Sequence, residues 1–404
     1  MRIIWNMQTI LRKYYAYNFF RWLSFWLPFI TLHLQGSGLN YTQILCLLLI
    51  SSLTQLFLEI PSGIFSDTFG RKTTLILSST AKFLFILTIV YSYQFWHFAI
   101  AWILLGTSDA LASGADSAFL YDTLKSTNRE KHYKKTEGIA WGYGMFGMGV
   151  GAFLGSQLIS NGFELPIILT GVAFFISMLI SFSLKEPQLF TNKKTTKYFQ
   201  ELEVSLHLFQ KDSSLLWLSL LGGTMIASML ISHLLFQPYM VNAGIKIQYF
   251  GTIYLLFLMA SVFSSLYAYK IERFIGPTFS LLLIPTGLGI HFFIMGTGYH
   301  VAGFLTIFLN QIIWGFIRPL IHDLLNQRVE SSTRATVLSF MGFVQGIMVL
   351  IAPLLGHYGD LISLRTTFFI MSFFVFSIGF LSCVKILKTT DYKFVPNRKT
   401  VHEE

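Results

Sequence analysis

Charged residues are scarce in this chain: Asp, Glu, Lys and Arg make up 12% of its 404 residues, whereas a soluble protein carries about a quarter. Apolar residues reach 53% and aromatic residues 17%, which argues against a water-soluble or disordered protein. Only two cysteines occur, Cys46 and Cys383, and both lie in apolar runs. They support neither a disulfide framework nor a metal site.

Long apolar segments dominate what is present. A bilayer core about 30 Å thick needs about 20 apolar residues in a helix, and two sets of six such segments occur. They lie near 14–34, 42–65, 74–94, 98–120, 138–160, 164–184, 214–240, 248–269, 277–297, 299–321, 335–356 and 364–385. The sequence therefore predicts an all-α membrane protein with twelve transmembrane helices in two six-helix, pseudo-symmetric bundles. The bundles would span 1–184 and 214–385, separated by a linker at 185–213 and followed by a tail at 386–404.

The basic residues test this topology, because loops on the cytoplasmic side hold most Lys and Arg. With the N-terminus inside, the inner segments hold 24 of the 29 basic residues and the outer segments hold two, Lys246 and Arg365. We therefore expect both termini in the cytoplasm of a plasma-membrane protein. The net charge of +10 is then explained by membrane topology and not by nucleic-acid binding.

The linker between the two sets carries apolar residues at helical spacing. Phe199, Leu202, Leu206 and Phe209 alternate with charged and polar residues. This pattern predicts either an amphipathic helix on the inner membrane surface or a solvated linker helix.

A glycine-rich, charged loop follows the second apolar segment. It resembles the signature loop of the major facilitator superfamily, G-x-x-x-D-x-x-G-R-K-x-x-L. The matching residues are Gly63, Asp67, Gly70, Arg71, Lys72 and Leu75. Two further segments resemble an EIPTG-type prokaryotic group of that family: 59–63, read as Glu-Ile-Pro-Ser-Gly, and the stretch from Ser113 to Asp122.

The resemblance implies alternating access around a central cavity lined mostly by spans one, four, seven and ten. It also implies proton-linked transport, often export of drugs or metabolites, and a gating motif made of Glu59 and the signature loop. In the fifth span, Gly147, Gly151 and Gly155 form a ridge that permits close helix packing.

Ionisable residues at membrane depth are costly and suggest function. Arg21 in span one and Asp109 in span four are expected to face one cavity and interact, with Asp109 as the proton site. A static ion pair that fixes helix packing is the alternative. Lys82 is expected to reach the membrane surface or pair with an acid, and Arg318 either to reach the surface or to contact an anionic ligand.

The four cavity-lining spans also carry amides, aromatic rings and a histidine that could bind a solute, although lipid-facing or core packing is the alternative for each ring. These candidates are Asn18, Trp22, Trp102, His233, Gln237, Asn310, Gln311 and Trp314, together with Arg318.

No phosphate-binding G-x-x-x-x-G-K-[ST] loop and no metal-ligand spacing such as H-E-x-x-H occurs in the sequence. We therefore expect a monomeric, proton-coupled secondary transporter that needs no cofactor or metal and binds a small-molecule substrate. Export is the expected direction. Uptake of a small polar solute is one alternative, and a membrane receptor or enzyme is another.

Overall fold

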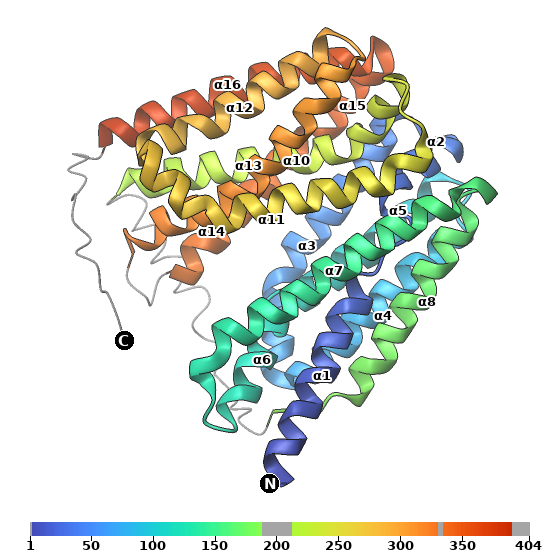
Figure 1. The fold of residues 1–404 in the computed structure, drawn as a ribbon, viewed down its shortest axis with the longest axis vertical. Helices are drawn as coiled ribbons and strands as arrows, with labels where there is room; N and C mark the ends of the chain where they lie inside the picture. The colour runs from blue at the N-terminus through green and yellow to red at the C-terminus, as the bar shows by residue number, and fades with distance from the viewer. Residues whose placement is uncertain (1, 188–211, 330–333, 390–404) are drawn as a thin grey trace.

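The computed structural model describes residues 2–187, 212–329 and 334–389, and these form helices joined by short loops (Figure 1). The first half contains α1 (Arg2–Trp22), η1 (Leu27–Phe29), α2 (Ile30–Gly36), α3 (Tyr41–Phe69), α4 (Arg71–Val90), α5 (Phe95–Ala112), α6 (Ala115–Lys125), η2 (Glu130–His132), α7 (Tyr133–Leu158), η3 (Ile159–Asn161) and α8 (Glu164–Ser183). The second contains α10 (Ser213–Asn242), η5 (Ile247–Tyr249), α11 (Phe250–Ile275), α12 (Pro277–Thr297), α13 (Val301–Asn326), α14 (Arg334–Met348), η6 (Val349–Ile351), α15 (Ala352–Leu361) and α16 (Leu364–Thr389).

Ten of these segments are long and apolar enough to cross a membrane. The other two predicted spans also run through the bundle, but α1 and α2 are separate helices and α7 is rich in glycine. The prediction of an all-helical membrane fold with two helix bundles is confirmed. Its proposed linker helix, including Phe199 and Leu202, lies outside the described residues.

The two halves repeat one packing scheme. In the first half α1 packs on α7 and α8, α5 packs on α3 and α4, and α4 packs on α8. In the second half α10 packs on α14 and α16, α13 packs on α11 and α12, and α12 packs on α16. Each half is therefore an open chain of neighbouring helices, α7–α1–α8–α4–α5–α3 in the first and α14–α10–α16–α12–α13–α11 in the second. Their end members pack across the halves, α7 on α11 and α3 on α15.

Two of the predicted spans are interrupted, which the apolar pattern alone does not predict. Residues 23–26 separate α1 from η1, and the backbone N–H of Phe25, which has no helical partner, donates to Oγ1 of Thr170 at 2.9 Å. In span four, Gly114 adopts a φ of +74° between α5 and α6. Since unpaired backbone groups are costly at membrane depth, broken helices in membrane proteins are typical of binding regions.

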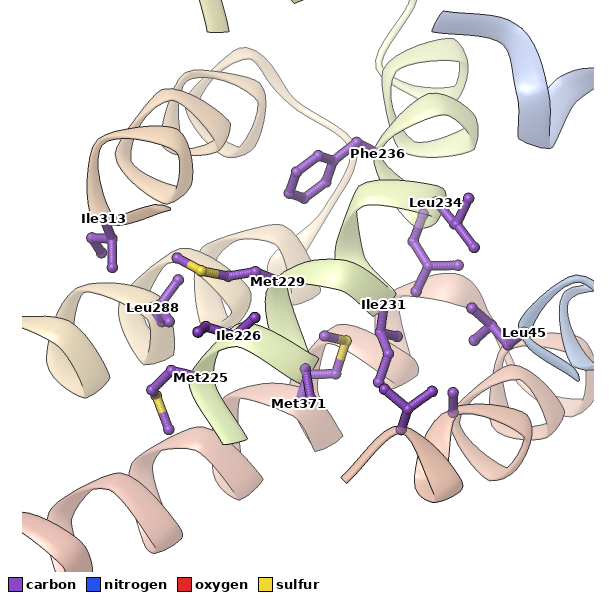
Figure 2. Packing of buried hydrophobic residues seen from close by; sticks show 14 of the residues in the cluster. Leu45, Met225, Ile226, Met229, Ile231, Leu234, Phe236, Leu288, Ile313 and Met371 are labelled. Atoms are coloured by element: carbon purple, nitrogen blue, oxygen red, sulfur yellow. The ribbon is translucent and has the colours of Figure 1, made fainter. Parts of the chain in front are cut away.

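The core of the second half surrounds α10. In Figure 2, Met225, Ile226 and Met229 of this helix lie among apolar side chains of α12, α13 and α16. Leu45 of α3 lies near Ile231 and Leu234 of α10, so the same cluster continues into the first half. The two halves thus share one continuous apolar core at this level.

The glycine ridge of α7 permits the close helix packing that was predicted, and its partner is the backbone of span one. A Cβ at Gly147 or Gly155 would collide with the carbonyl oxygen of Phe19 or Phe25, and one at Gly151 would lie 2.7 Å from the backbone nitrogen of Ser24. The ridge therefore holds the interrupted part of span one in place.

The halves touch each other only along part of their length. We call the end that carries the N-terminus and most basic loops the basic end, and the opposite end the far end. Gly251 of α11 packs on the backbone of α7 at Ala152, and Gly356 of α15 packs on the start of α3 at Thr42. These contacts lie in the far-end halves of the helices, where the ribbons of the two halves meet (Figure 1).

Two polar side chains bridge the halves at the far end. The carboxylate of Asp360 accepts hydrogen bonds from the backbone N–H groups of Tyr41 and Thr42, both at 2.8 Å. Oε1 of Gln237 accepts from the N–H of Thr31 at 2.8 Å, while its Nε2 donates to the carbonyl oxygen of Leu27 at 3.1 Å. Asp360 and Gln237 therefore fasten α15 to α3 and α10 to the second part of span one.

Toward the basic end the halves diverge. The contact between Leu56 of α3 and Gly346 of α14 lies near the middle of both spans. Beyond it, the side chains of Phe57, Ile60 and Ile64 on α3 are exposed, with Phe57 reaching 72%. The arrangement is closed at the far end and open at the basic end.

Replacing Gly155 with alanine should destabilise the protein, because the new methyl group would overlap the Phe25 carbonyl. Overpacking of this kind costs about 1–3 kcal/mol. Thermal unfolding of purified protein should therefore show a lower Tm for Gly155→Ala. Gly142→Ala on the same helix is the control, since a Cβ there meets nothing within 4 Å. Equal Tm values for the two variants would contradict the packing described.

Replacing Asp360 with asparagine should weaken the far-end junction. The charge of an acid at a helix N-terminus contributes about 0.3–1 kcal/mol at an exposed site, enough for up to about a fivefold change in population. Spin labels at Lys134 of α7 and Tyr269 of α11 would report the separation of the basic ends. Asp360→Asn should add a population with a shorter distance.

Glu164→Gln is the control for this measurement, because Glu164 is an exposed far-end acid on α8 outside the junction. The same distance distribution in Asp360→Asn as in the unmodified chain would show that the carboxylate does not hold the halves together.

Candidate functional site

Arg21 is the most enclosed charge in the first half. Its side chain is 3% exposed. Its Nη1 donates to Oγ of Ser78 at 2.7 Å and to the hydroxyl of Tyr17 at 3.3 Å, and its Nη2 lies 3.4 Å from Oγ of Ser108. Side chains from α1, α4 and α5 thus hold the guanidinium in one orientation.

Asp109 lies on the face of α5 that is turned toward Arg21 of α1. Its neighbours define this direction: Gly106 and Ala110 pack on α3, while Ser108 contacts Ser78 of α4. Oδ1 of Asp109 lies 3.7 Å from Nη2 of Arg21, and the Asp109 side chain is 40% exposed. The pair therefore has one buried member and one member open to water.

Two further charges lie near this pair. Lys82 of α4 is buried, with Nζ 4.8 Å from the ring centre of Trp22 and 5.4 Å from that of Phe174. This cation–π contact replaces the expected reach to the membrane surface. Asp116 opens α6, and its Oδ1 is buried with no hydrogen-bond partner among the described residues. Two cations and two carboxyl groups thus balance each other in the interior of the first half.

The remaining candidates in the first half differ in position. Nδ2 of Asn18 donates to the carbonyl oxygen of Tyr14 at 2.9 Å, and the side chain is buried. Trp22 packs edge-on against Trp141 with ring centres 6.0 Å apart. Trp102 is buried against Phe85 toward the far end. Of these, Trp22 lies beside the charged cluster, whereas Trp102 belongs to the core.

In the second half the candidates form two groups. His233 and Gln237 of α10 both contact Tyr254 of α11, His233 by ring packing at 5.4 Å and Gln237 by a hydrogen bond of 3.1 Å. In this state the Gln237 amide is already occupied by the far-end junction.

The second group lies on α13. Asn310 and Gln311 are buried, and Nδ2 of Asn310 has no hydrogen-bond partner among the described residues. Trp314 is half-buried and Arg318 is exposed, with the guanidinium carbon 5.7 Å from the Trp314 ring centre.

The signature loop forms a compact charged cluster at the basic end. Nη1 of Arg71 lies 2.6 Å from Oδ1 of Asp67, and its Nε lies 3.7 Å from Oδ2 of Asp122 on α6. Gly70 makes the sharp turn between α3 and α4 with a φ of +101°. Gly63 lies open on α3, where a Cβ would meet nothing within 4 Å.

Sequence reasoning missed the residue that completes this cluster. The carboxylate of Glu186 accepts from the backbone N–H groups of Arg71 and Lys72 at 2.7 and 2.8 Å, so it caps the start of α4. A Cβ at Gly70 would lie 2.9 Å from this carboxylate. An acid placed directly after the sixth apolar segment, in Lys185-Glu186-Pro187, was the available signal.

Glu59 lies one turn before the loop and is half-buried. Its backbone carbonyl oxygen accepts from Oγ of Ser62, which also donates to the carbonyl oxygen of Ala110. In the ranges 2–187, 212–329 and 334–389, no cluster of three His, Cys, Asp or Glu side chains is placed to hold a metal ion.

Solved structures resemble this fold over nearly the whole chain. A mutant form of the nucleoside transporter NupG has a TM-score of 0.80 at 12% identity, covering 94% of this chain and 100% of that chain. The D-xylose-proton symporter has a TM-score of 0.71 at 12% identity, with coverages of 96% and 97%. At these identities the likeness shows the fold alone.

A third structure is a bacterial homolog to the human lysosomal transporter Spinster, in an inward-facing and unoccupied conformation. Its TM-score is 0.72 at 12% identity, covering 96% of this chain and 98% of that chain. In sequence, none of the curated proteins matches this chain. The model of the Major Facilitator Superfamily, however, matches residues 15–353. Since this match covers most of the chain, the protein belongs to the Major Facilitator Superfamily.

Proposed function

We propose that this protein is a proton-coupled secondary transporter that moves a small solute by alternating access, with export of a drug-like or metabolite compound as its direction. The observation that carries the proposal is the pair of Arg21 and Asp109. It joins two cavity-lining spans, and its carboxylate is open to water while its guanidinium is buried.

Asp109 is the proton-binding group in this mechanism. At 3.7 Å, the guanidinium of Arg21 stabilises the ionised carboxylate. When the halves rock and water leaves the site, a carboxyl group separated from Arg21 is more stable in its protonated form. Loading and release of a proton then follow from the change in contact between these two side chains.

The far-end junction and the signature loop lie at the two ends of the protein that open and close in turn during transport. In the observed state Asp360 and Gln237 close the far end. The cluster of Asp67, Arg71 and Asp122 remains at the open basic end, beside the uncovered surface of Gly63. We infer that Glu59 and this loop support the contact that closes the basic end in the opposite state.

The basic end is assigned to the cytoplasm, because the Lys and Arg of the loops concentrate there. Both termini are then cytoplasmic, in the plasma membrane, and the protein acts as a monomer. Uptake is the second candidate direction. The likeness to the D-xylose-proton symporter favours it, because that protein couples a solute to protons by symport.

Replacing Asp109 with asparagine should abolish proton coupling while solute exchange continues. Proteoliposomes that contain the pH-sensitive dye pyranine would be challenged with a panel of nucleosides, sugars and aromatic acids. With a solute that gives a proton signal, Asp109→Asn should reduce gradient-driven accumulation at least tenfold, since loss of a proton-transfer group costs about 10²–10⁴-fold in rate. Solute counterflow without a gradient should persist.

Glu130→Gln, a change at an exposed acid in η2, is the control and should behave as the unmodified protein does. A static ion pair would give a different result: both accumulation and counterflow would fall in parallel with Tm. Unchanged dependence on the pH gradient in Asp109→Asn would refute the assignment of the proton site.

A further inference from the structure

The part of α13 nearer the basic end carries a polar and aromatic stripe. Gln311, Trp314 and Arg318 are spaced three and four residues apart, so they share one face of the helix. The guanidinium of Arg318 lies over the Trp314 ring at 5.7 Å. Arg318 precedes the end of the helix by eight residues, which is about 12 Å along the axis.

Packing on the other sides of α13 shows where this stripe points. On one flank, Phe308 packs on Phe257 and Gly315 packs on Ser261, both of α11. On the other flank, Ile321 lies against Gly222 of α10. Arg318 projects between these two flanks, on the face of α13 that lies between α11 and α10. The exposed surface of its side chain therefore faces the opening between the halves and not the lipid.

Arg318 also lacks a counter-charge. The ion pairs among the described residues join Arg21 to Asp109 and Arg71 to Asp67 and Asp122, and none includes Arg318. In the first half, Lys82 and Arg21 are offset by the two interior carboxyl groups. The nearest titratable neighbour of Arg318 along its own face is His322, one turn further. A guanidinium that is exposed to this opening at membrane depth, with no ion-pair partner among the described residues, favours an incoming anion.

We propose that Arg318 binds the anionic group of the transported solute, so that the substrate is an organic anion carrying a carboxylate or phosphate. The planar guanidinium offers two parallel N–H donors that match either group. The Trp314 ring provides an apolar wall for the carbon skeleton of the solute. This inference rests on the proposed function and names the substrate class for the same opening.

The first test compares solutes of matched shape and different charge. Purified protein in detergent would be given phenylacetate and phenyl phosphate, and then phenylacetamide and phenethylamine, while Tm is measured. We expect at least one of the anions to raise Tm and the neutral and cationic analogues to leave it unchanged. Arg318→Gln should weaken binding of that anion tenfold or more, because a hydrogen bond to a charged group is lost, and Arg318→Lys should retain part of it.

Lys270→Gln is the matched control, since Lys270 is another exposed cation over an aromatic ring, with Nζ 5.1 Å from the Tyr267 centre. It should keep full anion binding. Equal stabilisation by phenylacetate and phenylacetamide, no stabilisation by either anion, or an unaltered response in Arg318→Gln would each overturn the proposal. A Tm rise given only by dihexanoyl phosphatidylglycerol, and not by the soluble anions, would assign Arg318 to lipid and overturn it equally.

The second test needs no ligand. With Cys46 and Cys383 replaced by alanine, a reporter would be introduced as His322→Cys, one turn from Arg318. Its reaction rates with sulfonatoethyl and trimethylammonioethyl methanethiosulfonate would be compared. A unit charge about 6 Å away changes the ratio of the anionic to the cationic rate about tenfold in water, so Arg318→Gln should lower the ratio by about that factor. An unchanged ratio would mean that the guanidinium does not act on the opening.

These measurements separate the two proposals. Asp109→Asn should keep its anion binding in detergent, where no proton gradient exists. Loss of proton coupling alone would leave the anion site intact, and loss of anion selectivity alone would leave Asp109 as the proton site.

Discussion

Polar groups at membrane depth must find their partners inside the protein, and this constraint shapes each functional feature of the chain. Arg21 is surrounded by oxygen atoms from three helices. The break after α1 is tolerated because Thr170 accepts the freed N–H of Phe25. Gln237 satisfies its own amide with groups of the opposite half. Arg318 is the exception, since it is exposed to the opening and has no ion-pair partner among the described residues, and the inference about the substrate rests on this exception.

The same constraint explains why the halves can join at one end and remain apart at the other. At the far end, glycines allow backbones to approach closely, and Asp360 and Gln237 convert that approach into hydrogen bonds. At the basic end, the charges of the signature loop are satisfied within the first half, by Asp67, Asp122 and Glu186. The first half therefore does not depend on its partner to stabilise the charges of this loop at the open end.

The sequence predicted the features that depend on composition and short patterns. Apolar length predicted the crossings, and the spacing of Gly147, Gly151 and Gly155 predicted close packing along α7, for which the structure supplies the partner, span one. The position of Arg21 and Asp109 at membrane depth, on two spans that the resemblance places at the cavity, led to the expectation that they interact. The partners of distant segments could not be predicted. An acid directly after the sixth apolar segment marked Glu186, but no local pattern says that it caps α4. None specifies the contact of Asp360 with the start of α3 or of Lys82 with two aromatic rings either.

The interruption of span one at residues 23–26 has a mechanical consequence. The segment on one side, α1, is packed on α7 and α8 of its own half, whereas the segment on the other side, α2, is packed on α10 of the opposite half. A single span is thus shared between the two halves, because α1 packs on the first half and α2 packs on the second. Residues 23–26 and η1 separate α2 from Arg21, and the glycine ridge of α7 packs on this connection at Ser24 and Phe25. The part of span one that carries the charged pair is therefore anchored to its own half, and the part that follows the interruption is anchored to the other.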